Sequence, residues 1–150
     1  MFDLKKLQAV GAMVAKQARA KAAEDPEEAN DIIDMAPLLK PWKEGVWVRK
    51  DVCVYDGLPY WCMQAHDSTG TPMWSPAYDT ALWALYHGRD AAHALPFRAE
   101  GHNPYNKGHW MIWTDGYRYC SSMDNNVWTP EGYPHAWDGP FDEEGREVML

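Results

Sequence analysis

The apolar positions of the first forty residues follow the spacing of helices. Residues 3–24 are rich in Ala, Lys, Gln and Glu and contain no proline, and their apolar side chains recur three and four positions apart. This spacing places those side chains on one stripe of an amphipathic helix, which we predict for this segment. The stripe consists of Leu4, Leu7, Val10, Val14 and Ala18.

A second, shorter helix is predicted to follow directly. Asp25 can cap it, Pro26 suits the first helical position because its missing N–H is not needed there, and Glu28 completes a capping box. We expect this helix to run to about Met35 and to be stopped by Pro37, which cannot continue a helix.

Residues 1–40 thus form a predicted helical segment, and its first helix suggests self-association. The stripe is narrow and the helix is rich in Ala, so it can bury little surface within one chain. A narrow stripe at heptad-like spacing is typical of a seam between helices, although only about two to three heptads are available. We expect a homo-oligomer held through residues 2–24. The alternative is that the stripe packs on the rest of its own chain.

From Pro41 onward the pattern changes to strands and turns. Residues 46–55 alternate loosely, an Asp-Gly turn follows at 56–57, and residues 60–64 return, which together indicate a hairpin. The same pattern recurs around the Asp-Gly pair at 115–116. We therefore predict a mainly β protein with an N-terminal α-helical segment.

The β part of the chain contains an internal duplication. A Trp-Ser-Pro motif at 74–76 is followed by Trp83, and a Trp-Thr-Pro motif at 128–130 is followed by Trp137. In both copies the second tryptophan lies nine residues beyond the first, and the copies are 54 residues apart. With one inserted residue, Thr114, the preceding segments align aromatic on aromatic and Asp-Gly on Asp-Gly. The repeat sets the unit of folding.

Composition and charge narrow the class of partner. The 150 residues leave room for one ordinary domain or two small ones, and nine Trp and eight Tyr among Pro-Gly turns favour short strands. The formal net charge of −8 argues against nucleic-acid binding and against anionic membrane surfaces. No apolar run reaches the length of a signal-peptide core or a transmembrane span, so we expect a soluble product of cytoplasmic synthesis without a signal peptide.

The cysteines and histidines do not indicate a metal site or any other cofactor. Cys53 and Cys62 flank the turn at 56–59, so a cross-strand disulfide is conceivable, but cytosolic synthesis favours free thiols, and Cys120 has no obvious partner. None of the paired ligand spacings of zinc sites is present. Four histidines are expected at ordinary surface or interface positions: His93, His102, His109 and His135.

Residues 41–85 resemble the small chitin-binding domains of bacterial chitinases, carbohydrate-binding module families five and twelve. The resemblance is carried by Trp42, Trp47, the run Asp51 to Tyr60, the run Cys62 to His66, Trp74-Ser75-Pro76 and Ala81-Leu82-Trp83. Residues 97–140 resemble them more loosely, with Phe97 nearest to the Trp42 position and the His66 position lost in a shortened segment, and residues 141–150 form an acidic tail. The resemblance implies two small three-stranded antiparallel β modules in tandem.

The resemblance also implies that each module presents an aromatic residue to a polysaccharide, at the positions of Trp74 and Trp128. The C–H face of a sugar ring suits the electron-rich face of an indole. A core role for these two tryptophans stays open, while Trp83 and Trp137 are expected in the core. Packing is also expected for Tyr55, Tyr60, Trp113 and Tyr119, whereas Trp61 and Trp110 could serve either role. The candidate carbohydrate-binding residues are Trp74, Pro76, Trp128, Pro130, His66 and Trp42.

No catalytic residues are predicted. His66-Asp67-Ser68 and the pair His87 and Asp90 have residue types found in hydrolases, but the chain has no nucleophile elbow, paired catalytic carboxylates or phosphate loop. We therefore do not expect an enzyme.

The helical head joined to chitin-binding-like modules resembles small accessory proteins encoded among phage tail genes. This resemblance predicts a non-catalytic carbohydrate-binding or adhesion protein of a phage or phage-like tail, found in the virion tail after cytoplasmic synthesis. The expected partners are a polysaccharide or cell-wall glycan, copies of the chain and other tail proteins, but neither nucleic acid nor membrane. The rival hypothesis is a structural virion or assembly scaffold whose modules have lost sugar binding. Exposure of Trp74 and Trp128 would distinguish the two.

Overall fold

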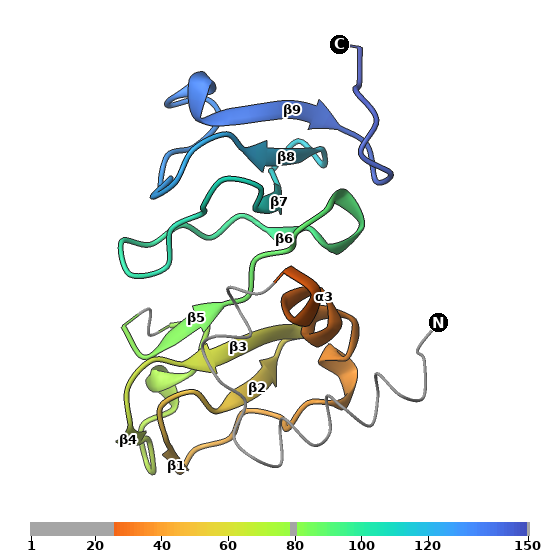
Figure 1. The fold of residues 1–150 in the computed structure, drawn as a ribbon. Coiled ribbons are helices and arrows are strands. Elements are labelled where there is room, and N and C mark those ends of the chain that lie inside the picture. Colours follow the sequence, from red (N-terminus) through yellow and green to blue (C-terminus); the bar gives the residue numbers. More distant parts are fainter. Residues whose placement is uncertain (1–25, 79–80, 150) are drawn as a thin grey trace. The chain divides into compact units, whose positions relative to one another are not determined.

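The computed structural model describes residues 26–78 and 81–149, and the chain divides into two compact units, Met1–Tyr86 and His87–Leu150 (Figure 1). The predicted fold class is confirmed: the chain is mainly β, with one α-helix near the N-terminal end of its described part and several small antiparallel sheets. Residues 87–96, between the two predicted modules, belong to the second unit. Each unit is described by itself.

The α-helix of the first unit, α3, spans Pro26–Asp34, close to the bounds predicted from the proline and acidic residues. A short 3-10 helix, η1, follows at Ala36–Leu38 and contains Pro37 at its start, where a proline needs no amide hydrogen. The predicted helix at 3–24 and the self-association seam lie outside the described residues.

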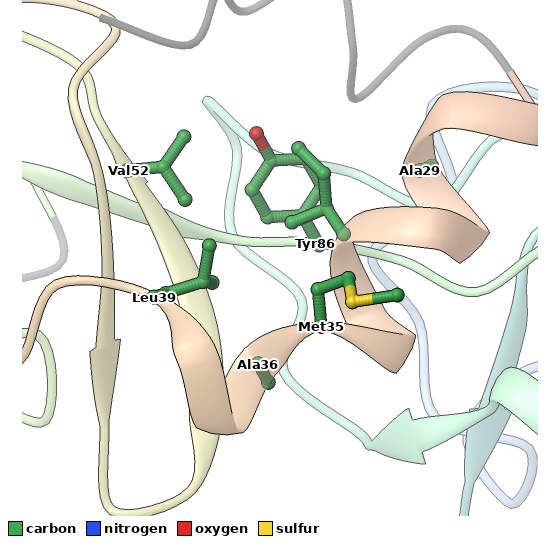
Figure 2. Close-up of a cluster of buried hydrophobic side chains, with 7 residues drawn as sticks. Ala29, Met35, Ala36, Leu39, Val52 and Tyr86 are labelled. Carbon is green, nitrogen blue, oxygen red and sulfur yellow. The ribbon is translucent and has the colours of Figure 1, made fainter. Parts of the chain in front are cut away.

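Helices α3 and η1 cover one face of the first unit's main sheet. Their apolar side chains are almost fully buried against Val52 and Tyr86, as Figure 2 shows. Burying one large aliphatic side chain contributes about 1.5–3 kcal/mol, so this cluster is a main source of the unit's stability. From the two helices and the residues that flank η1, the cluster includes Ala29, Ile32, Met35, Ala36 and Leu39.

The main sheet of the first unit has the antiparallel order β2-β3-β5. Asp56 and Gly57, the two residues of its hairpin turn, have φ values of 52° and 78°. This is the left-handed conformation for which Asp-Gly hairpin turns are selected. A smaller sheet pairs β1 with β4. The strands are β1 (Val46–Trp47), β2 (Val52–Tyr55), β3 (Leu58–Cys62), β4 (His66–Asp67) and β5 (Trp83–Leu85).

The second unit has one sheet in the order β6-β7-β8-β9, in which β6 is parallel to β7 and the other pairs are antiparallel. The three antiparallel strands predicted for the second module are β7, β8 and β9, and β6 is a fourth strand that lies before the predicted start at residue 97. The first unit has a shorter counterpart of β6, a single parallel bridge between Pro41 and Val54. The strands are β6 (Leu95–Pro96), β7 (Trp110–Ile112), β8 (Arg118–Ser121) and β9 (Trp137–Phe141).

Equivalent backbone hydrogen bonds recur in the two units. The Trp42 N–H donates to the Val54 carbonyl at 2.9 Å, and the Phe97 N–H donates to the Ile112 carbonyl at 3.0 Å. The inserted Thr114 lengthens the second hairpin loop, which Gly116 closes with a φ of 85°. The duplication in the sequence is thus a duplication of strand pairing.

One position in this repeat corrects the sequence alignment. Trp47 pairs with His66 in the first unit, and Tyr105 pairs with Asn126 in the second. The His66 position is therefore not lost from the second copy but is occupied by Asn126, whose side-chain amide donates to Ser121 Oγ and to the Ala136 carbonyl.

The conceivable disulfide between Cys53 and Cys62 is not formed. Cys53 lies opposite Tyr60 in the β2–β3 ladder, so the two cysteines are not cross-strand partners, and both are free and buried. Burial raises the pKa of the Cys53 thiol and raises that of Cys62 to about 11, which keeps both thiols protonated and unreactive at neutral pH.

Candidate functional site

Each unit exposes one tryptophan and buries another nine residues later. Trp74 and Trp128 are 39% and 42% exposed, whereas Trp83 is fully buried and Trp137 nearly so. The Trp83 indole N–H donates to the Trp74 carbonyl at 3.2 Å, and the Trp137 indole N–H donates to the Trp128 carbonyl at 2.9 Å. This hydrogen bond explains the nine-residue spacing of the repeated motif.

The bond also fixes the backbone of the exposed tryptophan. A buried indole N–H needs an acceptor, and here the acceptor is the backbone of the residue that carries the exposed indole. The buried ring is held in turn by an edge-on aromatic neighbour: Trp47 on Trp83 and Tyr105 on Trp137, each at 5.2 Å between ring centroids. The backbone of each exposed tryptophan is therefore anchored to the core of its unit.

The exposed tryptophan of the first unit belongs to an apolar loop. Met73 and Tyr78 on the same loop are 60% and 63% exposed. The loop contains the 3-10 helix η2 (Pro72–Trp74), and the Tyr78 N–H donates to the Ser75 carbonyl. We call Met73, Trp74 and Tyr78 the first aromatic patch.

The second unit has a corresponding surface. Val127 and Tyr133 are 41% and 40% exposed beside Trp128, and the Trp128 and Tyr133 rings meet edge-on at 5.6 Å. We call Val127, Trp128 and Tyr133 the second aromatic patch. Both copies thus place an apolar residue, a tryptophan and a tyrosine on the loop before the buried tryptophan.

The structure assigns His66 a supporting position. Its Nδ1 lies 2.8 Å from the Gln64 carbonyl, so this nitrogen carries the proton of that hydrogen bond. The ring is half-buried and packs edge-on against Trp74 and Trp83, with centroids 6.3 and 5.7 Å away. His66 therefore helps to orient the exposed indole.

The remaining candidate residues differ in accessibility. Pro76 is fully buried and is unable to contact a ligand, which corrects its assignment as a binding residue. Trp42 is half-buried and packs edge-on against Tyr55 at 5.8 Å. Pro130 is half-buried and lines a cleft of the second unit. Trp61 packs against the helix-covered cluster.

That cleft was not anticipated from the sequence. It has a volume of about 300 Å³ and lies between the β7–β8 hairpin, the loop before β9 and β9 itself. Trp113 and Tyr119, expected only to pack, form part of its wall. The sequence feature that could have indicated the cleft is Gly139, which lacks a side chain at the position where the first copy has Leu85. The lining residues are Trp113, Asp115, Tyr119, Pro130, Glu131, Pro134, Trp137, Gly139 and Pro140.

Two carboxylates accept hydrogen bonds from the aromatic residues that line the cleft. The Tyr119 hydroxyl donates to Asp115 Oδ2 at 2.7 Å, and the Trp113 indole N–H donates to Glu131 Oε1 at 3.4 Å. Burial, the bond to Asp115 and the negative charges of Asp115 and Glu131 raise the pKa of Tyr119 to about 12. The cleft therefore combines ring faces with net negative charge.

A buried histidine pair also lies in the second unit, where His109 was expected at an ordinary surface or interface position. The Nδ1 atoms of His87 and His109 are 3.3 Å apart, and His87 stacks on Tyr105 at 3.7 Å. Burial, and then the charges of His109 and Arg89, lower the pKa of His87 to about 3, and burial and Arg89 lower that of His109 to about 4. His109 Nδ1 accepts the Asn106 N–H at 3.0 Å. Both rings are therefore neutral structural groups at pH 7.

Within residues 26–78 and 81–149, no three His, Cys, Asp or Glu side chains are grouped so that they could hold a metal ion. Over the same residues, no helix is both long and apolar enough to span a membrane. Neither the family models nor the curated proteins with which the chain was compared match it.

Proposed function

We propose that this chain is a non-catalytic carbohydrate-binding protein that contacts a cell-surface glycan through its exposed tryptophans. The observation that carries the proposal is the repeated pair in which a buried indole anchors the backbone of an exposed one, Trp83 under Trp74 and Trp137 under Trp128. Exposed apolar side chains that are grouped together are typical of interaction sites, and here an apolar residue, a tryptophan and a tyrosine are exposed on the corresponding loop of each unit.

The physical chemistry of the patches supports a sugar ligand. An indole face offers both apolar area and a negative quadrupole to the C–H face of a pyranose. A tyrosine on each patch adds a hydroxyl that can donate to or accept from sugar hydroxyls. One such contact is weak, but two on one chain, multiplied in an oligomer, give avidity on a polymeric ligand.

We further propose that the protein is a component of a phage or phage-like tail, with residues 2–24 holding copies together and the two units presenting the patches. This location and this assembly rest on the resemblance of the chain to small tail accessory proteins. The alternative function is a structural scaffold in which other proteins cover both patches. Exposure of Trp74 and Trp128 in a single chain fits both functions, so it does not distinguish them as we expected from the sequence, and the experiment below does.

The test is a pull-down of the full chain on insoluble polysaccharides and purified cell walls, using wild type, Trp74→Ala and Trp128→Ala. Loss of a stacked indole should cost about 1–3 kcal/mol of affinity, by analogy with the stacking of bases on aromatic side chains. Val46→Ala is the matched control, because Val46 is apolar and 69% exposed but lies on β1 and outside the patches. Wild-type binding by both tryptophan variants would refute the proposal and favour the scaffold.

A further inference from the structure

The cleft of the second unit exists because the second copy departs from the first. Gly139 stands in the place of Leu85, which is 2% exposed, and Tyr119 in the place of Tyr60, which is 4% exposed. A Cβ atom at Gly139 would lie 2.8 Å from Tyr119 Cδ2, so a side chain there would displace the Tyr119 ring. The missing side chain leaves Tyr119 half-buried and opens the space beside it.

The loop that forms one wall of the cleft also differs from the corresponding loop of the first copy. Glu131 follows the repeated Trp-Thr-Pro motif, at the position where the first copy has Ala77. The substitution places a carboxylate at the cleft, and Asp115 supplies another from the hairpin loop. The described residues that line the cleft include no Lys, Arg or His. The cleft is thus an uncompensated acidic site with aromatic walls.

The carboxylates have acceptor capacity to spare. In the described part of the chain Glu131 accepts one bond, the 3.4 Å bond from Trp113, and Asp115 accepts from the Tyr117 N–H and the Tyr119 hydroxyl. An ionised carboxylate offers about four lone-pair sites. A ligand that donates several hydrogen bonds and carries positive charge would use the remaining sites and neutralise the pair.

We propose that this cleft binds a protonated amino sugar, a hexosamine whose amine is not acetylated. The proposal rests on the proposed function for the sugar body, and on the cleft itself for the amine. The ammonium group donates to Asp115 and Glu131 and lies against the rings of Trp113 and Tyr119, which attract a cation electrostatically. A volume of about 300 Å³ is at the lower end for ligand pockets and suits one sugar unit.

Acetylation of the amine should remove the interaction that makes the cleft prefer an amino sugar. An acetamide has no charge and one N–H, so an N-acetylated sugar would leave the two carboxylates desolvated without a counter-charge. The cleft therefore discriminates between a free and an acetylated amine, whereas the two aromatic patches contact only ring faces and hydroxyls and are indifferent to this group.

The experiment is a ¹H–¹⁵N NMR titration of the full chain that follows the indole N–H of Trp113, identified by its loss in Trp113→Phe. Glucosamine oligomers, N-acetylglucosamine oligomers and lysine amide are titrated in parallel. We expect the Trp113 signal to shift with the free amino sugar, at a Kd about tenfold or more below that for the acetylated oligomer. Equal binding of the two oligomers would overturn the proposal, and lysine amide binding as tightly as glucosamine would overturn the sugar assignment.

Variants of Glu131 test whether its negative charge is needed for binding, apart from any effect on the fold. Glu131→Gln keeps the shape and should weaken glucosamine binding about two- to fivefold, the effect of losing one solvent-exposed charge pair, and Glu131→Ala, which restores the residue of the first copy, should do the same. Glu143→Gln, at an exposed carboxylate outside the lining of the cleft, is the control and should bind like wild type. Unchanged binding by both Glu131 variants would refute the proposal.

The outcomes also distinguish this proposal from the proposed function. If Trp74→Ala loses polysaccharide binding while the Trp113 signal does not shift with any amino sugar, only the cleft assignment is refuted. If the Trp113 signal responds to glucosamine while Trp74→Ala and Trp128→Ala bind polysaccharide like wild type, the cleft assignment stands and the role of the aromatic patches falls.

Discussion

Replacing Trp83 by alanine should destabilise the first unit more than replacing Trp74. Trp83 is fully buried, and a buried tryptophan removes about 150–250 Å² from water. At about 25 cal/mol per Å², that area is worth roughly 4–6 kcal/mol, and measured losses for Trp-to-Ala changes in cores are about 3–5 kcal/mol. The change also leaves the Trp74 carbonyl without the indole donor.

Trp74 is 39% exposed, so its replacement removes less buried area and leaves no enclosed cavity. Because about three-fifths of its surface is still buried, we expect Trp74→Ala to cost less than Trp83→Ala but still a measurable part of the unit's stability. Because small domains are stable by about 5–15 kcal/mol, the loss at Trp83 consumes a large part of the stability of its unit.

The assay is urea unfolding of the full chain, with unit-specific NMR signals reporting each transition, paired with the polysaccharide pull-down. Trp74→Ala should lose binding and unfold at a urea concentration between those of Trp83→Ala and wild type. Trp83→Phe is the matched control, because it keeps most of the ring and removes the N–H donor, at an expected cost of about 1–3 kcal/mol. The reasoning is refuted if Trp74→Ala unfolds as early as Trp83→Ala, or if Trp83→Ala unfolds like wild type.

Three further predictions concern other parts of the chain. His87 and His109 have pKa values lowered to about 3 and 4 from the ordinary 6.5, so below pH 6.5 the unfolded chain binds protons that the folded unit does not. Their contribution to stability is therefore full above pH 6.5 and is lost as the pH falls towards 4. Urea unfolding of the second unit should show this loss between pH 7 and pH 5. Lys50 has a φ of 78° at the position of Gly108, so Lys50→Gly should stabilise the first unit by about 0.5–1 kcal/mol, measured by urea unfolding, and an unfolding midpoint below wild type would contradict this. Deletion of residues 2–24 should convert the homo-oligomer to a monomer in light scattering, and a monomeric full-length protein at micromolar concentration would contradict the seam.

The sequence by itself determined the features whose cause is local. The Asp-Gly pair at 56–57 required left-handed backbone and therefore a tight hairpin turn, and Pro26 set the beginning of α3. The repeated motif predicted that Trp83 and Trp137 lie in the core, and both are buried. It left open whether Trp74 and Trp128 are core or exposed.

Only the tertiary structure decided the features that depend on residues distant in the sequence. Pro76 and His109 have residue types common at surfaces, yet the strands and loops folded around them bury both. The cleft arises where Gly139 on β9 meets Tyr119 on β8, and no local pattern marks that meeting. Register and packing create such a site, because a missing side chain becomes a hollow only when the chain that faces it is known.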